Sequence, residues 1–310
     1  MREPYAVFFG DVAQDEFYAM PHFPASGDKV YVETLQPQFG GMVANAAAIY
    51  AHYARSTSFS SQLNSGALTQ KLLRQLRELG LNTHHVIFDE DVPDSHCIIM
   101  LSGDQHIVLI PSLGITRTEL TDATWDHFRG ADFLFTTLTD SIPFRRGPLR
   151  AGDVLAELRR QGVLVVMDID VYNPENHGSG LIAHCDILFM NAIGRRRFVE
   201  TGNDIAALLA AGATAIVVTL DRGGCEVHTA TGVELIDGHV VPVVDVTGAG
   251  DTFSSSFMFA YVSTRDAIES ARFANAAAAM SVGHVGARGG MTTEHDVRAF
   301  LAHRPVLENG

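Results

Sequence analysis

The stretch Asp245-Val-Thr-Gly-Ala-Gly-Asp-Thr-Phe253 decides how this chain is interpreted. It follows a β-rich run and precedes an apolar segment, so we expect a glycine turn that opens a helix. Glycines at such a turn let several backbone N–H groups point outward together and form a hole for an anion. Asp251 lies at the same place, where a carboxylate is useful if it takes a proton from a hydroxyl attacking a nearby phosphorus. The charge at the helix end should keep the pKa of Asp251 low, which makes its role as a base positional.

The same residues leave a plainer interpretation open. Gly248 to Thr252 would be an ordinary glycine-containing turn, with Asp251 as the N-cap of the following helix, an arrangement that many helices use. A bare Gly-x-Gly-Asp favours that plainer structure. The full nine residues are more specific, because they resemble the C-terminal signature of the ribokinase or PfkB carbohydrate-kinase family, which runs Asp-Thr-x-Gly-Ala-Gly-Asp-x-Phe.

The resemblance extends to the other end of the chain. Gly10, Asp15, the pair Gly40-Gly41 and Asn45 occur in the order and spacing of that family's N-terminal signature. It therefore covers nearly the whole chain. It implies a ribokinase-like three-layer α/β sandwich, with a mostly parallel central sheet, helices on both faces and a small β lid.

The pattern of apolar runs along the chain favours the same fold. Short β-like runs alternate with helical segments, which predicts a mostly parallel sheet. Strands are expected at 5–9, 132–136, 163–168, 187–190 and 214–219 and in short runs between 223 and 244, and helices at 42–53, 68–79, 148–161, 205–211 and over most of the chain after 249. Residues 122–126 and 142–152 are expected to be surface connections. We expect a single domain over 1–310, with the lid formed by about 16–39 and 95–111.

The activity that the resemblance implies is transfer of the γ-phosphoryl group of ATP to a primary hydroxyl of a sugar or sugar derivative. Asp251 would be the general base. The residues expected to stabilise the transferring group with their amides are Gly248, Ala249, Gly250 and Asp251. The residues expected to bind the acceptor are Asp15, Gly41 and Asn45, with Asp170 either a further ligand of an acceptor hydroxyl or a simple strand-terminating acid.

The nucleotide side is indicated by Thr219-Leu-Asp-Arg-Gly-Gly224, which is similar to the family's strand-end Thr-x-Gly-x-x-Gly. Asp221 stands where the family usually has a small residue. Asn275 falls where the family places a polar residue near adenine, and an amide on a helix surface explains it equally well. The candidate nucleotide contacts are Asn191, Thr219, Asp221, Gly224 and Asn275.

Two metal ions are implied by the resemblance. Family members hold a monovalent cation, largely through carbonyl oxygens, and K⁺ is expected at Asp245, Thr247, Ser281, His284, Gly286 and Gly290. For Mg²⁺ the family usually carries Asn-x-x-Glu, whereas this chain has Asn191-Ala-Ile-Gly194. Either Mg²⁺ is bound mainly through ATP phosphates, or Asp168 or Asp170 supplies the missing charge.

Composition limits the class of protein. Of the 310 residues, 46% are hydrophobic and 19% are charged, which is typical of a well-packed globular chain. The net charge of −14 argues against a nucleic-acid partner. No run reaches the ~18 apolar residues of a membrane helix or forms a signal peptide. Cys97, Cys185 and Cys225 are odd in number and far apart, as expected of reduced thiols in the cytoplasm.

Three points about function stay open at this stage. A sugar is the first-choice acceptor, but a nucleoside kinase of the same fold is the alternative if an extra apolar pocket holds the base. A non-catalytic protein that binds a sugar or nucleotide would explain the missing acid at Gly194, although the presence of Asp251 counts against it. Exposed strands of the lid make a homodimer plausible.

Overall fold

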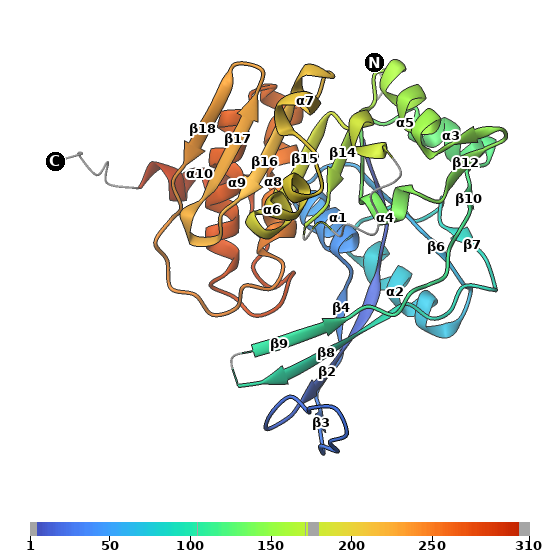
Figure 1. The fold of residues 1–310 in the computed structure, drawn as a ribbon, viewed down its shortest axis with the longest axis vertical. Helices are drawn as coiled ribbons and strands as arrows, with labels where there is room; N and C mark the ends of the chain where they lie inside the picture. The colour runs from blue at the N-terminus through green and yellow to red at the C-terminus, as the bar shows by residue number, and fades with distance from the viewer. Residues whose placement is uncertain (1–4, 104, 171, 173–179, 304–310) are drawn as a thin grey trace.

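The structure, a computed structural model, describes residues 5–103, 105–170, 172 and 180–303. Its centre is an eight-stranded sheet (Figure 1). The strands are β1 (Ala6–Phe9), β5 (Thr57–Ser60), β11 (Phe133–Thr136), β14 (Leu164–Asp168), β15 (Ile187–Asn191), β16 (Ala215–Thr219), β17 (Cys225–Thr229) and β18 (Gly232–Ile236). They lie in the order β18-β17-β16-β15-β14-β11-β1-β5. All neighbours pair in parallel except β16–β17 and β17–β18.

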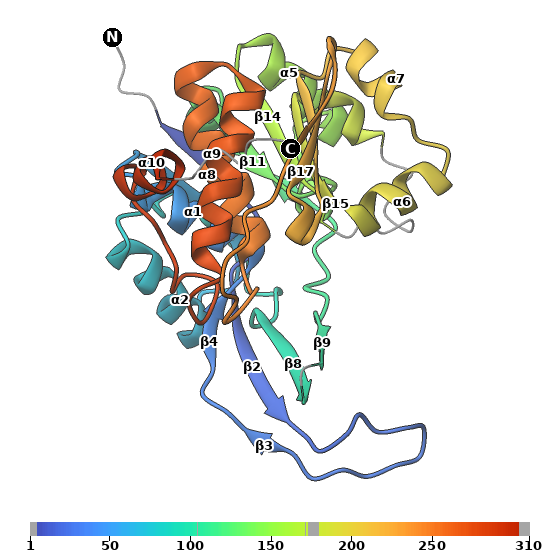
Figure 2. The ribbon, with the colours of Figure 1, turned by 90° about the vertical axis from the view of Figure 1, so that its left-hand side faces the viewer.

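Helices cover both faces of this sheet (Figure 2). One face packs against α1 (Met42–His52), α2 (Ala67–Glu78), α8 (Ala249–Thr264), α9 (Ala267–Ser281) and α10 (Glu294–Ala302). The other packs against α3 (Asp122–Phe128), α4 (Leu138–Ser141), α5 (Ala151–Arg160), α6 (Ala192–Glu200) and α7 (Ile205–Ala210). Strand β1 shows why both faces need cover: Ala6 and Phe8 join one buried cluster, and Val7 and Phe9 join the other. A central strand of a parallel sheet, buried on both faces, is expected to be a nearly continuous apolar run, as β1 is.

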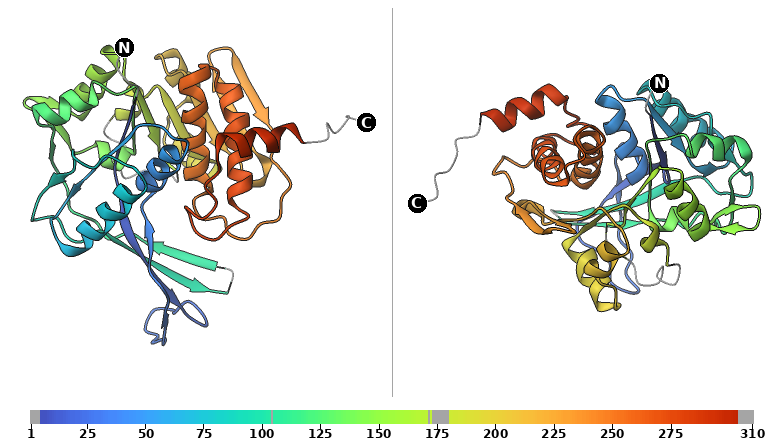
Figure 3. Two further views of the ribbon diagram at one scale, coloured as in Figure 1. Left: turned by 180° about the vertical axis from the view of Figure 1, so that it is seen from behind. Right: turned by 90° about the horizontal axis from the view of Figure 1, so that it is seen from above.

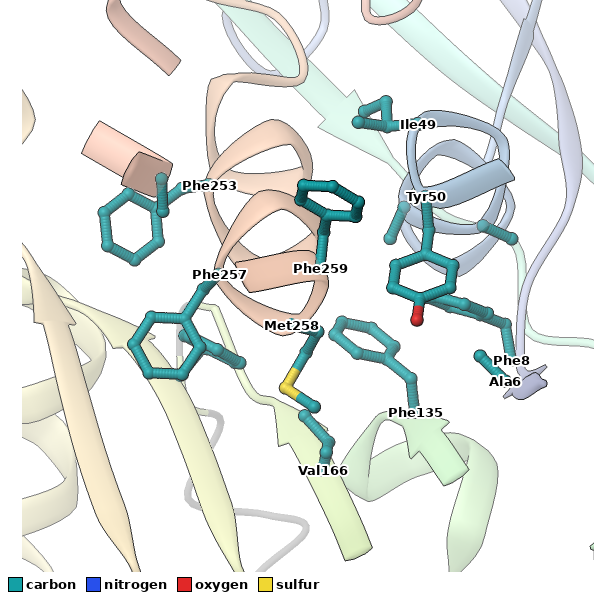
Figure 4. Close-up of a cluster of buried hydrophobic side chains, with 14 of the residues drawn as sticks. Ala6, Phe8, Ile49, Tyr50, Phe135, Val166, Phe253, Phe257, Met258 and Phe259 are labelled. Carbon is teal, nitrogen blue, oxygen red and sulfur yellow. The ribbon is translucent and has the colours of Figure 1, made fainter. Parts of the chain in front are cut away.

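The packing of α1 against α8 positions the functional residues. Figure 4 shows Phe257 of α8 and Tyr50 of α1 directed toward the sheet, where their rings contact Phe189 of β15 and Phe8 of β1. The Ser255 hydroxyl of α8 donates to the carbonyl of Ala46 in α1 at 2.6 Å, which small side chains along α1 permit. Because the two helices lie side by side, their N-terminal turns meet at the carboxyl edge of the sheet.

A smaller sheet projects from this edge (Figures 1 and 3). Its strands are β2 (Ala13–Ala19), β3 (Glu33–Thr34), β4 (Gln38–Gly40), β8 (His96–Ser102) and β9 (Gln105–Leu109). They lie in the order β3-β2-β8-β9, with β4 also paired to β2. The hairpin of β8 and β9 and the short strands before α1 follow the sequence pattern, and Asp15 lies within β2. The remaining short elements are β6 (Gln62–Leu63), β7 (Ile87–Phe88), β10 (Thr118–Glu119), β12 (Phe144–Arg146), β13 (Leu149–Arg150), η2 (Leu181–His184) and η3 (Asp221–Gly223).

Four local expectations were wrong. Residues 122–126 form most of α3, because Thr121 caps the helix and Trp125 is buried. The connection at 142–152 contains β12 and β13, so the helix expected from 148 begins at Ala151. Residues 237–248 form no strand, and the helical part after 249 is interrupted at 282–293.

Among the described residues, none of the helices combines the length and the apolar character needed to span a membrane.

Candidate active site

One cavity of about 370 Å³ lies where the carboxyl ends of β14, β15 and β16 meet the first turns of α1 and α8. Parallel strands end at a common edge, which is the usual position of sites in such sheets. The predicted residues that line the cavity are Asp15, Gly41, Asn45, Asp170, Asn191, Thr219, Thr247, Gly248, Ala249, Gly250 and Asp251. The predicted residues outside its lining are Asp221, Gly224, Asp245, Asn275, Ser281, His284, Gly286 and Gly290.

The glycine motif forms the predicted turn at the start of α8. Gly248 is the N-cap, with a φ of 76°, and a Cβ there would lie 2.6 Å from the Cα of Ala287. Only glycine fits both restraints. Asp251 is the third helical residue, so the plainer interpretation in which it is the N-cap is wrong. The N–H of Ala249 already donates to the Val246 carbonyl at 3.2 Å, whereas those of Gly250 and Asp251 belong to a first turn that offers no helical acceptor.

Asp251 is held by α1 and surrounded by other acids. The Asn45 amide donates from Nδ2 to Oδ2 of Asp251 at 2.9 Å. Burial raises the pKa of Asp251 well above 3.8, and the Asn45 hydrogen bond opposes this rise only in part. Nearby carboxylates raise that pKa further, namely those of Asp168, Asp11 and Asp170. The expectation of a low pKa was therefore wrong, because desolvation and like charges outweigh the helix end.

The acceptor side is built around the turn into α1. Gly41 has a φ of 95°, and a Cβ there would lie 2.6 Å from the Cα of Val12. The backbone can therefore approach the cavity at this point, as predicted, only because residue 41 lacks a side chain. Asp15 on β2 faces Cys97, and burial raises the pKa of Asp15 to about 6. The Gly41 backbone at the start of α1 and the Asp15 carboxyl on β2 can therefore both contact hydroxyls of an acceptor.

Two acids were missed by the sequence analysis: Asp11, which lines the cavity, and Asp140, which lines a second cavity next to it. Asp11 follows β1 and accepts hydrogen bonds from the N–H groups of Met42 and Val43 at 3.0 and 2.9 Å, so it caps α1 from another element. Asp140 in α4 accepts a hydrogen bond from the Thr137 hydroxyl, and the N–H of Asp140 donates to the oxygen of the same hydroxyl, so Thr137 caps α4. Burial raises the pKa of Asp140 to about 7, with the nearby Asp11 carboxylate as the next cause. The only signal in the sequence was a Gly-Asp pair and a Thr-x-x-Asp cap after buried strands.

Substitution Asp140→Asn is expected to stabilise the protein at pH 8 by about 2 kcal/mol but not at pH 4. The pKa of Asp140 rises from 3.8 to about 7 on folding. The folded state therefore keeps a proton that the unfolded state releases, and stability falls as pH rises through this window. Thermal unfolding at both pH values measures the effect, with the exposed Asp126→Asn as the matched control. Equal changes in Tm at the two pH values would contradict it.

Position 194, where the family usually has an acid, lies against the backbone of Asp170 just after β14. Asp170 adopts a left-handed φ of 36°, and its Oδ1 accepts from the Asn191 amide at 2.8 Å. A Cβ at Gly194 would lie 2.1 Å from the Asp170 carbonyl oxygen. Asp168 accepts from the N–H of Asp170, and burial raises the pKa of Asp168 to about 7. The close approach of the Asp170 backbone to residue 194 thus requires glycine there.

The predicted nucleotide residues divide into two groups. Asn191 and Thr219 are paired at the ends of β15 and β16 and line the cavity. Asp221, with a φ of 50°, and Gly224 belong to the next turn, which packs closely on residues 236–238. Asn275 is buried and its amide donates to the Asp237 carbonyl at 2.8 Å, so it is not the helix-surface amide that we considered.

The predicted K⁺ positions come from two loops in contact. Asp245 accepts hydrogen bonds from Thr247 and, at 2.8 Å, from the N–H of Gly286. Gly290 packs against the backbone of Ser281, to whose carbonyl the N–H of His284 donates. Within the described part of the chain, no three His, Cys, Asp or Glu side chains come together as a metal site. A cation here would depend on carbonyl oxygens, as the resemblance implied.

A second cavity of about 460 Å³ adjoins the first. The two share lining residues, namely Asp11, Met42, Cys97, Ile110, Asp168 and Asp170. Its far side combines apolar side chains such as Leu63 and Ile115 with polar ones such as Gln62 and Thr118. The acceptor side of the site is therefore larger than the first cavity alone.

The family described as pfkB family carbohydrate kinase matches residues 4–294. The chain belongs to this family. This pfkB-family chain is 37% identical to the ribokinase of Bacillus subtilis over 297 residues, which cover 94% of the chain and 98% of that relative. Its fold is similar to Arabidopsis thaliana ribokinase complexed with ribose and ATP, with a TM-score of 0.79, 24% identity, and coverage of 98% of this chain and 100% of the other. A ribokinase II of E. coli in complex with ATP and Mg²⁺ gives a TM-score of 0.77 at 13% identity, over 98% of this chain and 100% of the other. The predicted family, fold and enzyme class, a carbohydrate kinase, are confirmed.

Proposed function

We propose that the protein transfers the γ-phosphoryl group of ATP to a primary hydroxyl of a sugar or sugar derivative, with Asp251 as general base. The observation that carries this is the position of Asp251: in the first turn of α8, beside the glycine turn, with its carboxylate held by Asn45. Its raised pKa suits a base, because a carboxylate with a raised pKa has a higher affinity for the proton that it takes.

Each part of the cavity has a role in this proposal. The acceptor would be bound by Asp15, Gly41, Asn45 and Asp170. In the Gly248–Asp251 turn, the N–H groups of Gly250 and Asp251 would stabilise charge on the transferring group, which the helix N-terminus favours, whereas that of Ala249 donates to the Val246 carbonyl. ATP would lie along Asn191 and Thr219, with the turn at Asp221 and Gly224 and the loop anchored by Asn275 beyond them. The small sheet would close over the acceptor as a lid.

Mg²⁺ fits this site through few protein ligands. It is commonly bound by one or two carboxylates together with substrate phosphates. Asp168 and Asp170 supply carboxylates beside Asn191 at the cavity wall, which supports their role in place of an acid at 194. The ion would neutralise charge on the phosphate oxygens.

K⁺ is proposed at the contact of the loops around Asp245 and Gly286. Replacing K⁺ by tetramethylammonium at constant ionic strength is expected to lower kcat about tenfold, which corresponds to about 1.4 kcal/mol of barrier. The cause would be a less ordered Gly248 turn, since the loop carrying Gly286 and Ala287 packs directly against it. Rates measured across a K⁺ titration test this. A rate independent of K⁺ would remove the ion from the proposal.

A nucleoside acceptor is the second candidate, and the second cavity favours it. A space of about 460 Å³ next to the acceptor site, with apolar and polar walls, suits a base or another ring attached to the sugar. The test is ADP release from Mg-ATP across hexoses, ketoses, ketonic sugar acids and nucleosides. A preference for nucleosides would select the second candidate. Failure of the whole panel would favour a protein that binds its ligand without turning it over.

A homodimer through the small sheet is also proposed. Strand β9 is an exposed edge strand, and its Ile107, Val108 and Leu109 are exposed apolar residues. Such edges are commonly covered by pairing. Sedimentation velocity is expected to show a dimer for the wild type and a monomer for Leu109→Lys. A wild-type monomer at micromolar concentration would contradict this.

Because Cys97, Cys185 and Cys225 are all buried free thiols, we place the protein in the reducing cytoplasm.

A further inference from the structure

Arg288 lies in the loop between α9 and α10 and contacts Asn45, which lines the cavity. Its Nε donates to Oδ1 of Asn45 at 2.8 Å. Its other two nitrogens donate to Oε1 of Gln75 in α2 and, at 3.4 Å, to the carbonyl of Gly40. All three acceptors are uncharged oxygen atoms, and among the described residues no carboxylate lies within 4.0 Å of the guanidinium as an ion pair. Arg288 is therefore held by charge-assisted hydrogen bonds to neutral oxygen atoms and not by a salt bridge.

The chemistry of arginine decides how the Asn45 amide is oriented. A guanidinium has donors and no acceptor, so the atom of Asn45 that faces it must be the oxygen. The amide nitrogen then faces Asp251, at 2.9 Å from its Oδ2. If the amide were turned over, two donors would meet at Arg288 and two acceptors would meet at Asp251. Because Asn45 is only 6% exposed, water cannot easily relieve such a mismatch.

The loop that carries Arg288 is fixed to the glycine turn. The N–H of Gly286 donates to Oδ2 of Asp245 at 2.8 Å, and Ala287 fills the space left by the missing side chain of Gly248. The two residues before Arg288 thus contact the turn that presents Asp251. The base and the residue that orients its partner are placed by one packed unit.

We propose that Arg288 is a positioning residue for the transfer step. It acts through Asn45: by fixing the orientation of that amide, it holds the Asp251 carboxylate toward the acceptor. The kinetic consequence rests on the proposed kinase function, whereas the orientation of the amide does not. Nothing in the nine-residue motif or in the N-terminal signature points to residue 288, since the contact joins segments that are far apart in the sequence.

Two substitutions separate positioning from a merely structural role. Arg288→Gln has a side chain that can donate or accept, so it no longer dictates the amide orientation, whereas Arg288→Lys keeps a group that only donates. With the best acceptor of the panel, Arg288→Gln is expected to lower kcat about 30-fold with little change in KM for ATP, and Arg288→Lys to retain most of kcat. The exposed Arg129→Gln is the matched control and should behave as wild type. Equal losses in Arg288→Gln and Arg288→Lys, or a change in KM alone, would overturn the proposal.

A double-mutant cycle tests whether the effect passes through Asn45. In the Asn45→Ala background, Arg288→Gln is expected to cost less than about threefold, because the amide that it orients is gone. The same loss in both backgrounds would show that Arg288 acts by another route and would overturn the proposal.

An NMR measurement without acceptor keeps the proposal testable if no acceptor is found or if Arg288→Gln does not fold. The side-chain N–H₂ resonances of Asn45 are identified by their loss in Asn45→Ala. In the wild type and in Arg288→Lys they are expected to shift when Asp251→Asn is introduced, and in a folded Arg288→Gln this response should be lost. Resonances that do not respond to Asp251→Asn in the wild type would overturn the orientation, whatever the reaction of the protein.

Discussion

Asp251→Asn is expected to lower kcat by about 10³-fold while leaving the fold and the KM for ATP nearly unchanged. The substituted amide keeps the size of the carboxylate and can still accept a hydrogen bond from Asn45, which Asp251 does at 2.9 Å. It cannot take a proton from the acceptor hydroxyl. The loss would therefore fall on the transfer step and not on binding.

The measurement is acceptor-dependent ADP release, together with the Tm of the variant. Because burial raises the pKa of Asp251, removing the charge should stabilise the protein or leave Tm unchanged at pH 8. A Tm well below that of the wild type would attribute the lost rate to unfolding. A variant with the wild-type rate would rule out Asp251 as the base, even if the protein is a kinase.

Gly194→Glu restores the acid of the family's Asn-x-x-Glu pattern, but we expect it to lower both the stability and the activity of this protein. A Cβ at residue 194 would lie 2.1 Å from the Asp170 carbonyl oxygen, so the loop after β14 must move. We expect a loss of about 3 kcal/mol in stability and at least a tenfold loss in kcat/KM for Mg-ATP, because the hydrogen bond between Asn191 and Asp170 would break.

Chemical unfolding and an Mg²⁺ titration of the rate measure these two effects. Ile193→Glu is the control, because it adds the same charge one residue away at an exposed position. If Gly194→Glu instead reacted faster or at lower Mg²⁺, the acid would belong at position 194 and Asp170 would not replace it.

The parts of the site that were predictable from the sequence are those written in contiguous motifs. The turn before α8 was predictable because glycines at fixed spacing have few backbone solutions, and Gly248 and Gly41 indeed have positive φ. Apolar runs between turns predicted the positions of β1, β11, β14, β15 and β16 and a mostly parallel sheet, but not the order of the strands in that sheet. The helix at Asp122–Phe128 was missed because its polar surface resembles a loop, although Thr121 caps it.

The contacts that were not predictable join distant segments. Asp11 and Asp140 come together near Gly10, with more than a hundred residues between the two acids. The prediction of a low pKa for Asp251 was wrong for the same reason. The helix end is local, but the elements that bury Asp251 and bring the carboxylates of Asp168 and Asp11 near it come from elsewhere in the chain. The left-handed φ of Asp170 was not predicted, because aspartate tolerates this conformation at many turns and its residue type alone does not say where the chain adopts it.

The most direct test of the proposed function is to follow a radiolabelled γ-phosphoryl group from ATP to its acceptor. Wild-type protein is incubated with ATP radiolabelled in its γ-phosphate, Mg²⁺, K⁺ and each acceptor of the panel, beside Asp251→Asn. The account predicts that the label appears on a primary hydroxyl of one sugar or nucleoside with the wild type, and about 10³-fold more slowly with the variant. Label that goes only to free phosphate, or that reaches the acceptor equally fast with both proteins, would contradict it.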